Sequence, residues 1–336
     1  MLLVGSDDGV YALPGPDESA DVTDRLTSAG EADGSSGVVK TLSSGRAMRL
    51  RQFDGLPGVF AATASGLIHS PDGDNWIGLG VPEPKVYAVG ATLDGERLYA
   101  GTRPAAVYAT DVFVPGDRAP TVDWRELDGF QDLPSREEWR LPRHEDLAQV
   151  RDVTADPADP DRVVAGVEVG GVHVSDDRGE TWTERRSDVN DDVHELHVVG
   201  PGEYVAATGF GLFRTRDAGQ SWTRLDEAVD QRYFRRVFSL GETVYAAGAL
   251  ASSASWDDPD ADPALFAVRD DALTQVGIPD EAGTVTGMAA VDGDLVAATH
   301  RGSLFAVRGN EVQRFGAFPV PDDATGSYTP VAWLPE

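Results

Sequence analysis

The chain repeats one short pattern of apolar and polar positions seven times. Each copy contains an apolar segment such as V-A-A-T, a turn with glycine, and a second apolar segment such as G-L-F. Short apolar segments bounded by turn residues indicate β-strands rather than helices. A self-similar period of about 40 to 50 residues indicates a propeller or a solenoid. The copies lie at 2–13, 59–70, 98–110, 163–175, 204–215, 244–268 and 295–307.

The segments group into seven units of four strands. Residues 150–226 show this most clearly, because eight strand-like segments follow one another there, separated by Gly, Pro and Asp. A four-stranded antiparallel meander cannot bury both faces alone, so the units must stack around an axis. The sequence therefore predicts an all-β fold: a single-domain, seven-bladed β-propeller of four-stranded antiparallel blades, with strands a to d counted outward from the axis. The expected blades are about 1–45 plus 328–336, 46–82, 85–130, 150–187, 192–228, 232–278 and 284–316.

The two ends of the chain are predicted to complete one blade. Residues 2–4 and 10–13 read as strands b and c without a strand a, whereas the apolar segment 328–334 follows a complete seventh blade. Pairing of the C-terminal strand with the N-terminal blade would remove an exposed sheet edge.

Two insertions, 131–149 and 249–263, are expected on the face that carries the d–a and b–c loops. Long loops on a rigid scaffold commonly carry function. Their residues Trp139 and Trp256, if exposed, would suit a sugar or a protein partner. The alternative is that both insertions only cap the central channel.

Three repeats continue into a turn that ends in tryptophan, as in S-D-D-R-G-E-T-W. The Asp side chain can accept turn N–H groups, the Gly permits the bend, and the Trp can pack on the next blade. The turns resemble the Asp-box, or BNR repeat, of sialidases, sortilin-type receptors, xyloglucanases and the photosystem II assembly factor. The resemblance implies a structural role on c–d hairpins for Asp72, Trp76, Asp177, Gly179, Trp182, Asp217, Gly219 and Trp222.

The families that share this repeat range from glycosidases to protein scaffolds, so the resemblance leaves both classes open. The sialidase pattern includes R-I-P in the first inner strand, three arginines for the substrate carboxylate and a Tyr–Glu nucleophile pair. The similar string here, Arg140-Leu141-Pro142, lies in the insertion before the fourth blade, which disfavours a sialidase. A lyase or an epimerase on the same scaffold is a third hypothesis.

The charge balance narrows the possible environments and partners. The chain has 57 acidic and 28 basic residues, a net charge of −29, and lysine only at Lys40 and Lys85. Such a composition, with 41% hydrophobic residues, indicates a protein of haloarchaeal type that stays soluble in concentrated salt. An acidic surface evolved for a basic partner is disfavoured because the acidic residues occur in every repeat. Nucleic acid is excluded as a partner, since phosphate binding needs basic stripes.

Several classes of site are excluded by the motifs that are missing. The chain has no cysteine, no P-loop, no G-x-G-x-x-G and no G-x-S-x-G, so no cofactor is predicted. His194 and His197 are three apart on one strand and Pro263 stands where a calcium loop needs Gly, so no metal is predicted. The N-terminus reads as a strand rather than a signal peptide, and no apolar run reaches about 18 residues. We therefore expect a cytoplasmic protein without membrane contact.

Aligned inner strands place an unexpected set of side chains at one level of the channel: Arg49, Tyr87, Arg151, His194, Arg235, Thr286 and Thr329. Arg103 and His300, on b–c loops, and Arg140 could join them. Guanidinium groups suit a carboxylate, a sulfate or a phosphate, which predicts an anion site. The alternative is that each Arg pairs with Asp152, Glu195 or Glu168 between blades.

These observations favour a non-catalytic cytoplasmic scaffold that binds a protein or an acidic small molecule on the d–a/b–c loop face. The alternative is a sialidase-like glycoside hydrolase acting on an acidic sugar. That enzyme would need Tyr87 or Tyr233 within hydrogen-bond reach of a carboxylate such as Glu195.

Overall fold

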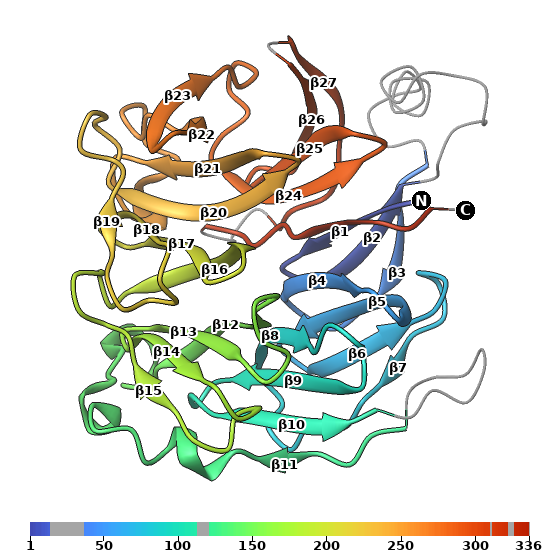
Figure 1. Cartoon of the computed structure of the whole chain (residues 1–336). Helices are drawn as coiled ribbons and strands as arrows, with labels where there is room; N and C mark the ends of the chain where they lie inside the picture. Colours follow the sequence, from blue (N-terminus) through green and yellow to red (C-terminus); the bar gives the residue numbers. More distant parts are fainter. Residues whose placement is uncertain (14–36, 113–120, 310, 322–325, 336) are drawn as a thin grey trace.

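The chain folds into seven four-stranded antiparallel sheets around a central axis (Figure 1). The computed structural model describes all residues except 14–36, 113–120, 310, 322–325 and 336, so parts of the expected blades 1–45, 85–130, 284–316 and 328–336 lie outside the described residues. The expected all-β, seven-bladed propeller is confirmed. Within the described residues, no helix has the length and apolar character needed to cross a membrane.

Six blades follow the chain order, and in each the first strand contacts the first strands of its neighbours around the axis. The second blade contains β4 (Ala47–Phe53), β5 (Leu56–Thr63), β6 (Gly66–Ser70) and β7 (Ile77–Gly78). The third contains β8 (Val86–Ala91), β9 (Arg97–Thr102), β10 (Val107–Asp111) and β11 (Arg125–Glu126). The fourth contains β12 (Gln149–Ala155), β13 (Val163–Glu168), β14 (Gly171–Ser175) and β15 (Thr183–Glu184).

The other three blades that follow the chain order have the same arrangement. The fifth contains β16 (Val193–Gly200), β17 (Glu203–Thr208), β18 (Gly211–Thr215) and β19 (Thr223–Arg224). The sixth contains β20 (Tyr233–Leu240), β21 (Thr243–Ala249), β22 (Ala264–Arg269) and β23 (Ala272–Val276). The seventh contains β24 (Val285–Val291), β25 (Asp294–Thr299), β26 (Ser303–Arg308) and β27 (Glu311–Ala317).

The first blade is built from both ends of the chain, as the strand count predicts. Its strand order is β28 (Val331–Trp333), β1 (Leu2–Ser6), β2 (Gly9–Leu13) and β3 (Val39–Leu42). The C-terminal strand β28 pairs antiparallel with β1, with Leu2 opposite Trp333. The closing segment also packs tightly on the seventh blade, because a Cβ on Gly287 would lie 1.7 Å from the Thr329 carbonyl oxygen. The ring therefore has no open inner edge at the chain ends.

Six inner strands contain a register shift at the same level, where one residue bulges out of the ladder. A bulge re-aims side chains, so the bulged residue and the next one can both face the channel. The bulged residues are Met48, Tyr87, Arg151, His194, Arg235 and Thr286.

The alignment of the inner strands with one another, made from the sequence, was wrong by one residue in β4. It placed Arg49 beside Arg151, but the register places Met48 at that level and pairs Arg49 with Ala62. Arg49 thus belongs to a second level, one residue further along each inner strand, with Asp152, Glu195 and Arg236. The alternation of residues along a strand hides this shift, because it depends on where the ladder bulges.

The three tryptophan-ending turns join the third and fourth strands of their blades. In the turn before β15, Asp177 accepts hydrogen bonds from the Thr181 backbone N–H at 2.8 Å and its hydroxyl at 2.6 Å. The Gly179 N–H donates to the Ser175 hydroxyl at 2.7 Å. The same contacts occur around Asp217, Ser221 and Gly219 in the fifth blade. In the second blade Asp72 instead accepts the backbone N–H groups of Asp74 and Asn75 and the Asn75 side-chain amide. These contacts hold the turns, and backbone and side-chain donors lower the pKa values of Asp72, Asp177 and Asp217.

Both insertions contain short 3-10 helices and buried tryptophans. Helices η1 (Asp128–Phe130), η2 (Arg136–Glu138) and η3 (Pro142–His144) lie before the fourth blade, and η4 (Ser253–Ser255) lies in the sixth. Trp139 is 3% exposed and Trp256 is 2% exposed. The two tryptophans therefore anchor the insertions and are not available to a sugar or a partner, unlike the expectation from sequence.

Candidate functional site

The channel mouth beneath the insertions is lined by buried basic and aromatic side chains. Arg151 is 1% exposed, and its Nε donates to the His194 carbonyl oxygen at 3.2 Å. Its Nη1 contacts the Tyr328 hydroxyl and lies 3.2 Å from Glu168 Oε2. Burial and the nearby Arg235 guanidinium lower the pKa of Arg151 to about 9, which still leaves it charged at neutral pH. Arg151 is therefore a paired residue that holds the mouth together.

Arg235 differs from Arg151 in having no polar partner. It is 7% exposed, and its guanidinium stacks on the Tyr328 ring at 4.2 Å from the ring centre. It makes no hydrogen bond or ion pair with any described residue, and its nitrogen atoms are not sealed from solvent. A guanidinium offers five N–H donors, so Arg235 retains its full capacity to bind an anion.

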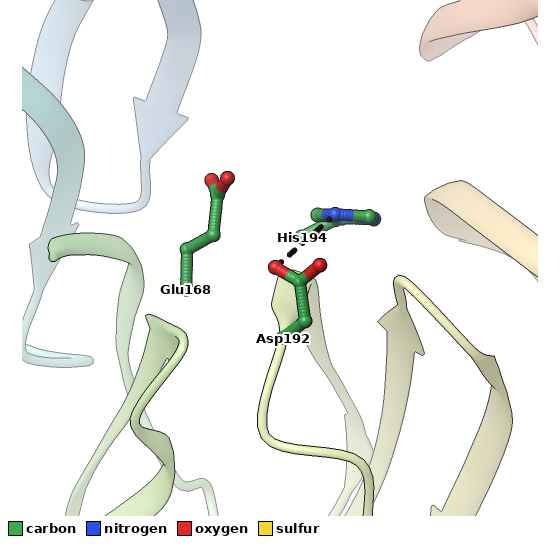
Figure 2. A group of neighbouring side chains, drawn as sticks. All are labelled: Glu168, Asp192 and His194. Atoms are coloured by element: carbon green, nitrogen blue, oxygen red, sulfur yellow. Dashed lines mark ion pairs between the residues drawn. The ribbon is translucent and has the colours of Figure 1, made fainter. Parts of the chain in front are cut away.

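Glu168, Asp192 and His194 lie close together (Figure 2), and Glu168 is the one that pairs with Arg151. Glu168 ends β13, Asp192 precedes β16, and an isolated antiparallel bridge joins their backbones. One ligand atom from each of the three side chains lies within 4.8 Å of the others. Burial would raise the pKa of Glu168, but the nearby guanidinium groups, Arg151 above all, outweigh burial and lower it to about 2. The expectation from sequence considered His194 only with His197 and did not consider this group.

The second level of the channel is a buried ion network that includes Arg49. The Arg49 guanidinium lies 3.7 Å from Asp152 and 3.6 Å from Glu195, and Arg236 lies 2.5 Å from Glu195. Arg51 approaches the same two carboxylates. Burial raises the pKa of Asp152, whereas Arg236, Arg49 and Arg51 overcome burial and hold that of Glu195 below its usual range. The sequence left two interpretations of Arg49, an anion site or an ion pair between blades, and the structure shows the ion pair.

The other candidate binding residues lie apart from one another. Arg103 stacks on Tyr87, 5.3 Å from the ring centre, above the mouth. His300 accepts the Thr284 N–H on Nδ1 and contacts Asp257 through Nε2, so it fixes the second insertion. Arg140 is exposed and makes no hydrogen bond or ion pair with the described residues. Only Arg103 is thus placed to extend the cluster at the channel mouth.

The tyrosine–carboxylate pair expected of a sialidase is not formed by the candidate residues. Glu195 bonds to Arg236, Arg49 and Arg51 at the second level. Tyr233 instead packs on His194, with ring centres 4.5 Å apart, and Tyr87 lies among Met48 and Tyr328. Glu195 follows the bulge at His194 and belongs to the second level, whereas Tyr87 is itself a bulged residue and Tyr233 lies before the bulge in β20.

A cavity of about 460 Å³ opens beside the mouth, between the first insertion and the loops of the fifth and sixth blades. Phe210 and Leu250 line it and are 55% and 40% exposed. Its polar lining residues are Arg143, Asp192, Arg232, Tyr233, Ser252 and Ser253. An apolar rim beside cationic side chains can take a peptide segment with both apolar and acidic residues.

The sequence analysis did not predict two residues that are important at the mouth. Tyr328, on which Arg151 and Arg235 stack, immediately precedes the Thr329 that the alignment chose. Asp192 lies in a loop that no strand pattern marks. The aromatic residue next to an aligned ring position was the one available signal for Tyr328.

Comparison with known proteins relates the chain to other propellers. No family model and no curated protein matches the sequence. Similar solved structures include a GH74 xyloglucanase from Xanthomonas campestris, with 16% identity, a TM-score of 0.56 and coverage of 81% of this chain and 45% of the enzyme. The WD40 propeller domain of Doa1 has 12% identity and a TM-score of 0.56, covering 81% and 83% of the two chains. YCF48 bound to D1 peptide has 13% identity and a TM-score of 0.52, covering 78% and 80%.

The likeness is one of fold. At 12 to 16% identity these structures share the propeller architecture with this chain, and a propeller hosts many unrelated functions. This chain also spans less than half the length of the xyloglucanase. The function must therefore be inferred from the site.

Proposed function

We propose that this propeller is a non-catalytic binding protein that holds an acidic peptide segment of a partner protein at the channel mouth. The main support for this proposal is the state of Arg235. Its side chain is largely buried, its guanidinium stacks on Tyr328, and it has no hydrogen bond or ion pair with a described residue. Its nitrogen atoms are open to solvent and hold no hydrogen bond to a described residue, so an incoming carboxylate can bind them without displacing another side chain. A bidentate carboxylate is the geometric match for the planar guanidinium fork.

The adjoining cavity supports a peptide rather than a small acid. Phe210 and Leu250 offer exposed apolar surface, and Arg143 and Arg232 add positive charge on the same lining. Tyr233 lines the cavity and also lies near Arg235. Burial raises the pKa of Tyr233, and the Arg235 guanidinium partly offsets this rise. YCF48, a propeller of similar fold, is bound to a peptide in its structure.

A sialidase-like hydrolase is the weaker proposal. Two GH74 structures are among the similar folds, and the tryptophan-ending turns resemble Asp-boxes. However, neither Tyr87 nor Tyr233 forms a hydrogen bond with Glu195, which is bonded to three arginines. The nucleophile arrangement that motivated this alternative is therefore not provided by those residues.

Replacement of Arg235 should remove binding without harming the fold. A tetraglutamate peptide is the probe, with citrate as the small-molecule comparison, and calorimetry or fluorescence anisotropy gives the affinity. Arg235→Gln should weaken peptide binding at least about tenfold, because one charge-assisted bond contributes roughly 1.5 to 3 kcal/mol. Its melting temperature should fall only slightly, since the side chain loses its stacking on Tyr328 but no hydrogen bond or ion pair with a described residue.

Arg140→Gln is the matched control, because it removes the same charge from an exposed residue that makes no hydrogen bond or ion pair with the described residues. It should bind the peptide as the unmodified protein does. Equal loss in both variants would indicate a general charge effect and contradict a site at Arg235. Binding of citrate but not of the peptide would replace the partner protein with a small acid.

We further propose that the protein works in concentrated salt in the cytoplasm, which the net charge of −29 supports. Repulsion should be strong in dilute buffer and screened as the Debye length falls from about 10 Å at 0.1 M to about 3 Å at 1 M. The melting temperature is therefore expected to rise steeply with potassium chloride up to about 2 M. Sucrose at equal osmolality is the control, and a flat response to the salt would contradict the halophilic proposal.

A further inference from the structure

His194 Nε2 and Asp192 Oδ1 face each other without a hydrogen bond between them. His194 is fully buried, and its Nε2 lies 3.5 Å from Asp192 Oδ1 (Figure 2). Neither atom is exposed to solvent, and neither has a hydrogen-bond partner among the described residues. Such a pair is unusual, because buried polar atoms are normally satisfied.

The other ring nitrogen shows which tautomer of His194 is present. Nδ1 lies 2.7 Å from the Phe234 carbonyl oxygen, which can only accept a hydrogen bond. Nδ1 therefore carries the hydrogen, and in the neutral ring Nε2 presents its lone pair to the Asp192 carboxylate. A metal-bound histidine commonly donates its other ring N–H to a backbone carbonyl, and Nδ1 of His194 makes that contact here.

We propose that Asp192, His194 and Glu168 bind a divalent transition-metal ion at the channel mouth. Ligands about 2.1 Å from a tetrahedral ion lie about 3.4 Å apart, close to the observed separation of Asp192 and His194. The imidazole favours zinc or a similar ion over calcium and magnesium, which prefer oxygen ligands alone.

Glu168 supplies the third ligand through Oε1. Its Oε2 is held by Gln149 and lies 3.2 Å from Arg151. Its Oε1 accepts a hydrogen bond from Arg143, whose side chain is 55% exposed. Solvent can take over the bond from Arg143, so Oε1 can turn to the ion while Oε2 stays in place. Departure of Arg143 also removes one of the positive charges that oppose a cation here.

The loops that contain Asp192 and Gly209 determine how close the site lies to solvent and how much space surrounds it. Asp192 lines the 460 Å³ cavity, so one of the three side chains lies at the border between the site and solvent. Gly209 leaves space for the carboxylate, since a Cβ there would lie 2.3 Å from Asp192 Oδ2. This inference does not rest on the proposed peptide, because Arg235 is not a ligand.

Zinc binding to the full chain tests the site. Equilibrium dialysis in about 2 M potassium chloride suppresses unspecific attraction of cations to the acidic surface. One equivalent of Zn²⁺ should bind to the unmodified protein and to Asp191→Asn, which removes a neighbouring exposed carboxylate. Asp192→Asn should weaken binding about 100-fold or more, since even loss of a residue that only supports a ligand costs 10- to 100-fold.

Cobalt absorption and the histidine NMR signals provide the independent readouts. Co²⁺ should give a visible band in the unmodified protein and in Arg235→Gln, but not in His194→Gln. Failure of the peptide experiment with retention of this band would leave the metal site standing. The absence of stoichiometric Zn²⁺ binding, or equal binding by Asp191→Asn and Asp192→Asn, would overturn the proposal. In that case NMR should show two N–H protons on His194, meaning that a proton fills the gap.

Discussion

A chain that lacks residues 327–336 is expected to lose its cooperative unfolding transition and to aggregate. The deletion removes β28, the inner strand of the first blade, and exposes the pairing edge of β1. It also removes the bonds from Gly5 N–H to the Pro330 carbonyl and from Leu334 N–H to the Met1 carbonyl. Tyr328, on which Arg151 and Arg235 stack, is lost as well. Calorimetry and light scattering measure the outcome.

A point substitution tests the same closure without shortening the chain. Gly287→Ala places a methyl group where the Thr329 carbonyl now lies, so the closing segment must shift, at a cost of about 3 kcal/mol. Gly78→Ala is the matched control, because nothing lies within 4 Å of its added methyl group, and its effect should stay within about 0.5 kcal/mol. If the truncated chain and Gly287→Ala both melt like the full protein, strand β28 does not close the ring.

Neutralising Glu195 should be the most damaging conservative change in the channel. Glu195→Gln keeps the shape of the side chain but leaves Arg236 without its anionic partner in a buried site, and leaves Arg49 with Asp152 alone. Removing one partner of a buried ion pair costs about 3 to 5 kcal/mol. Glu180→Gln is the control, because it breaks an exposed pair with Arg125 and should cost no more than about 1 kcal/mol. Denaturant unfolding at neutral pH measures both.

The pH dependence of the same variant gives a second check. Arg236 and its neighbours hold the pKa of Glu195 below its usual value of 4.5, against the effect of burial. The unfolded chain therefore takes up this proton first as the pH falls, and the contribution of the carboxylate is present above pH 4.5 and lost below it. The stability difference between the unmodified protein and Glu195→Gln should shrink in acid. A difference that is constant from pH 7 to pH 3 would contradict the role of this charge.

The repeat pattern was sufficient to predict the architecture. Alternating apolar positions, glycine turns and the unpaired strands at the chain ends predict seven blades and their closure by the C-terminal strand, and the structure has both. Such features are local or countable, because strand formation follows from residue type and spacing. The presence of arginines at the channel was also visible in the aligned inner strands.

Which of those arginines is available for a ligand was decided only by the tertiary structure. Bulges in the inner strands put Met48, not Arg49, beside Arg151, and moved Arg49 into the network with Asp152 and Glu195. Tyr328 and Asp192 lie just before the inner strands β28 and β16, outside the strand pattern that the sequence shows, and the fold brings both to the mouth. A register shift of one residue turns a side chain to the opposite face of the sheet. Whether a charged side chain is paired depends on neighbours that are far away in the sequence.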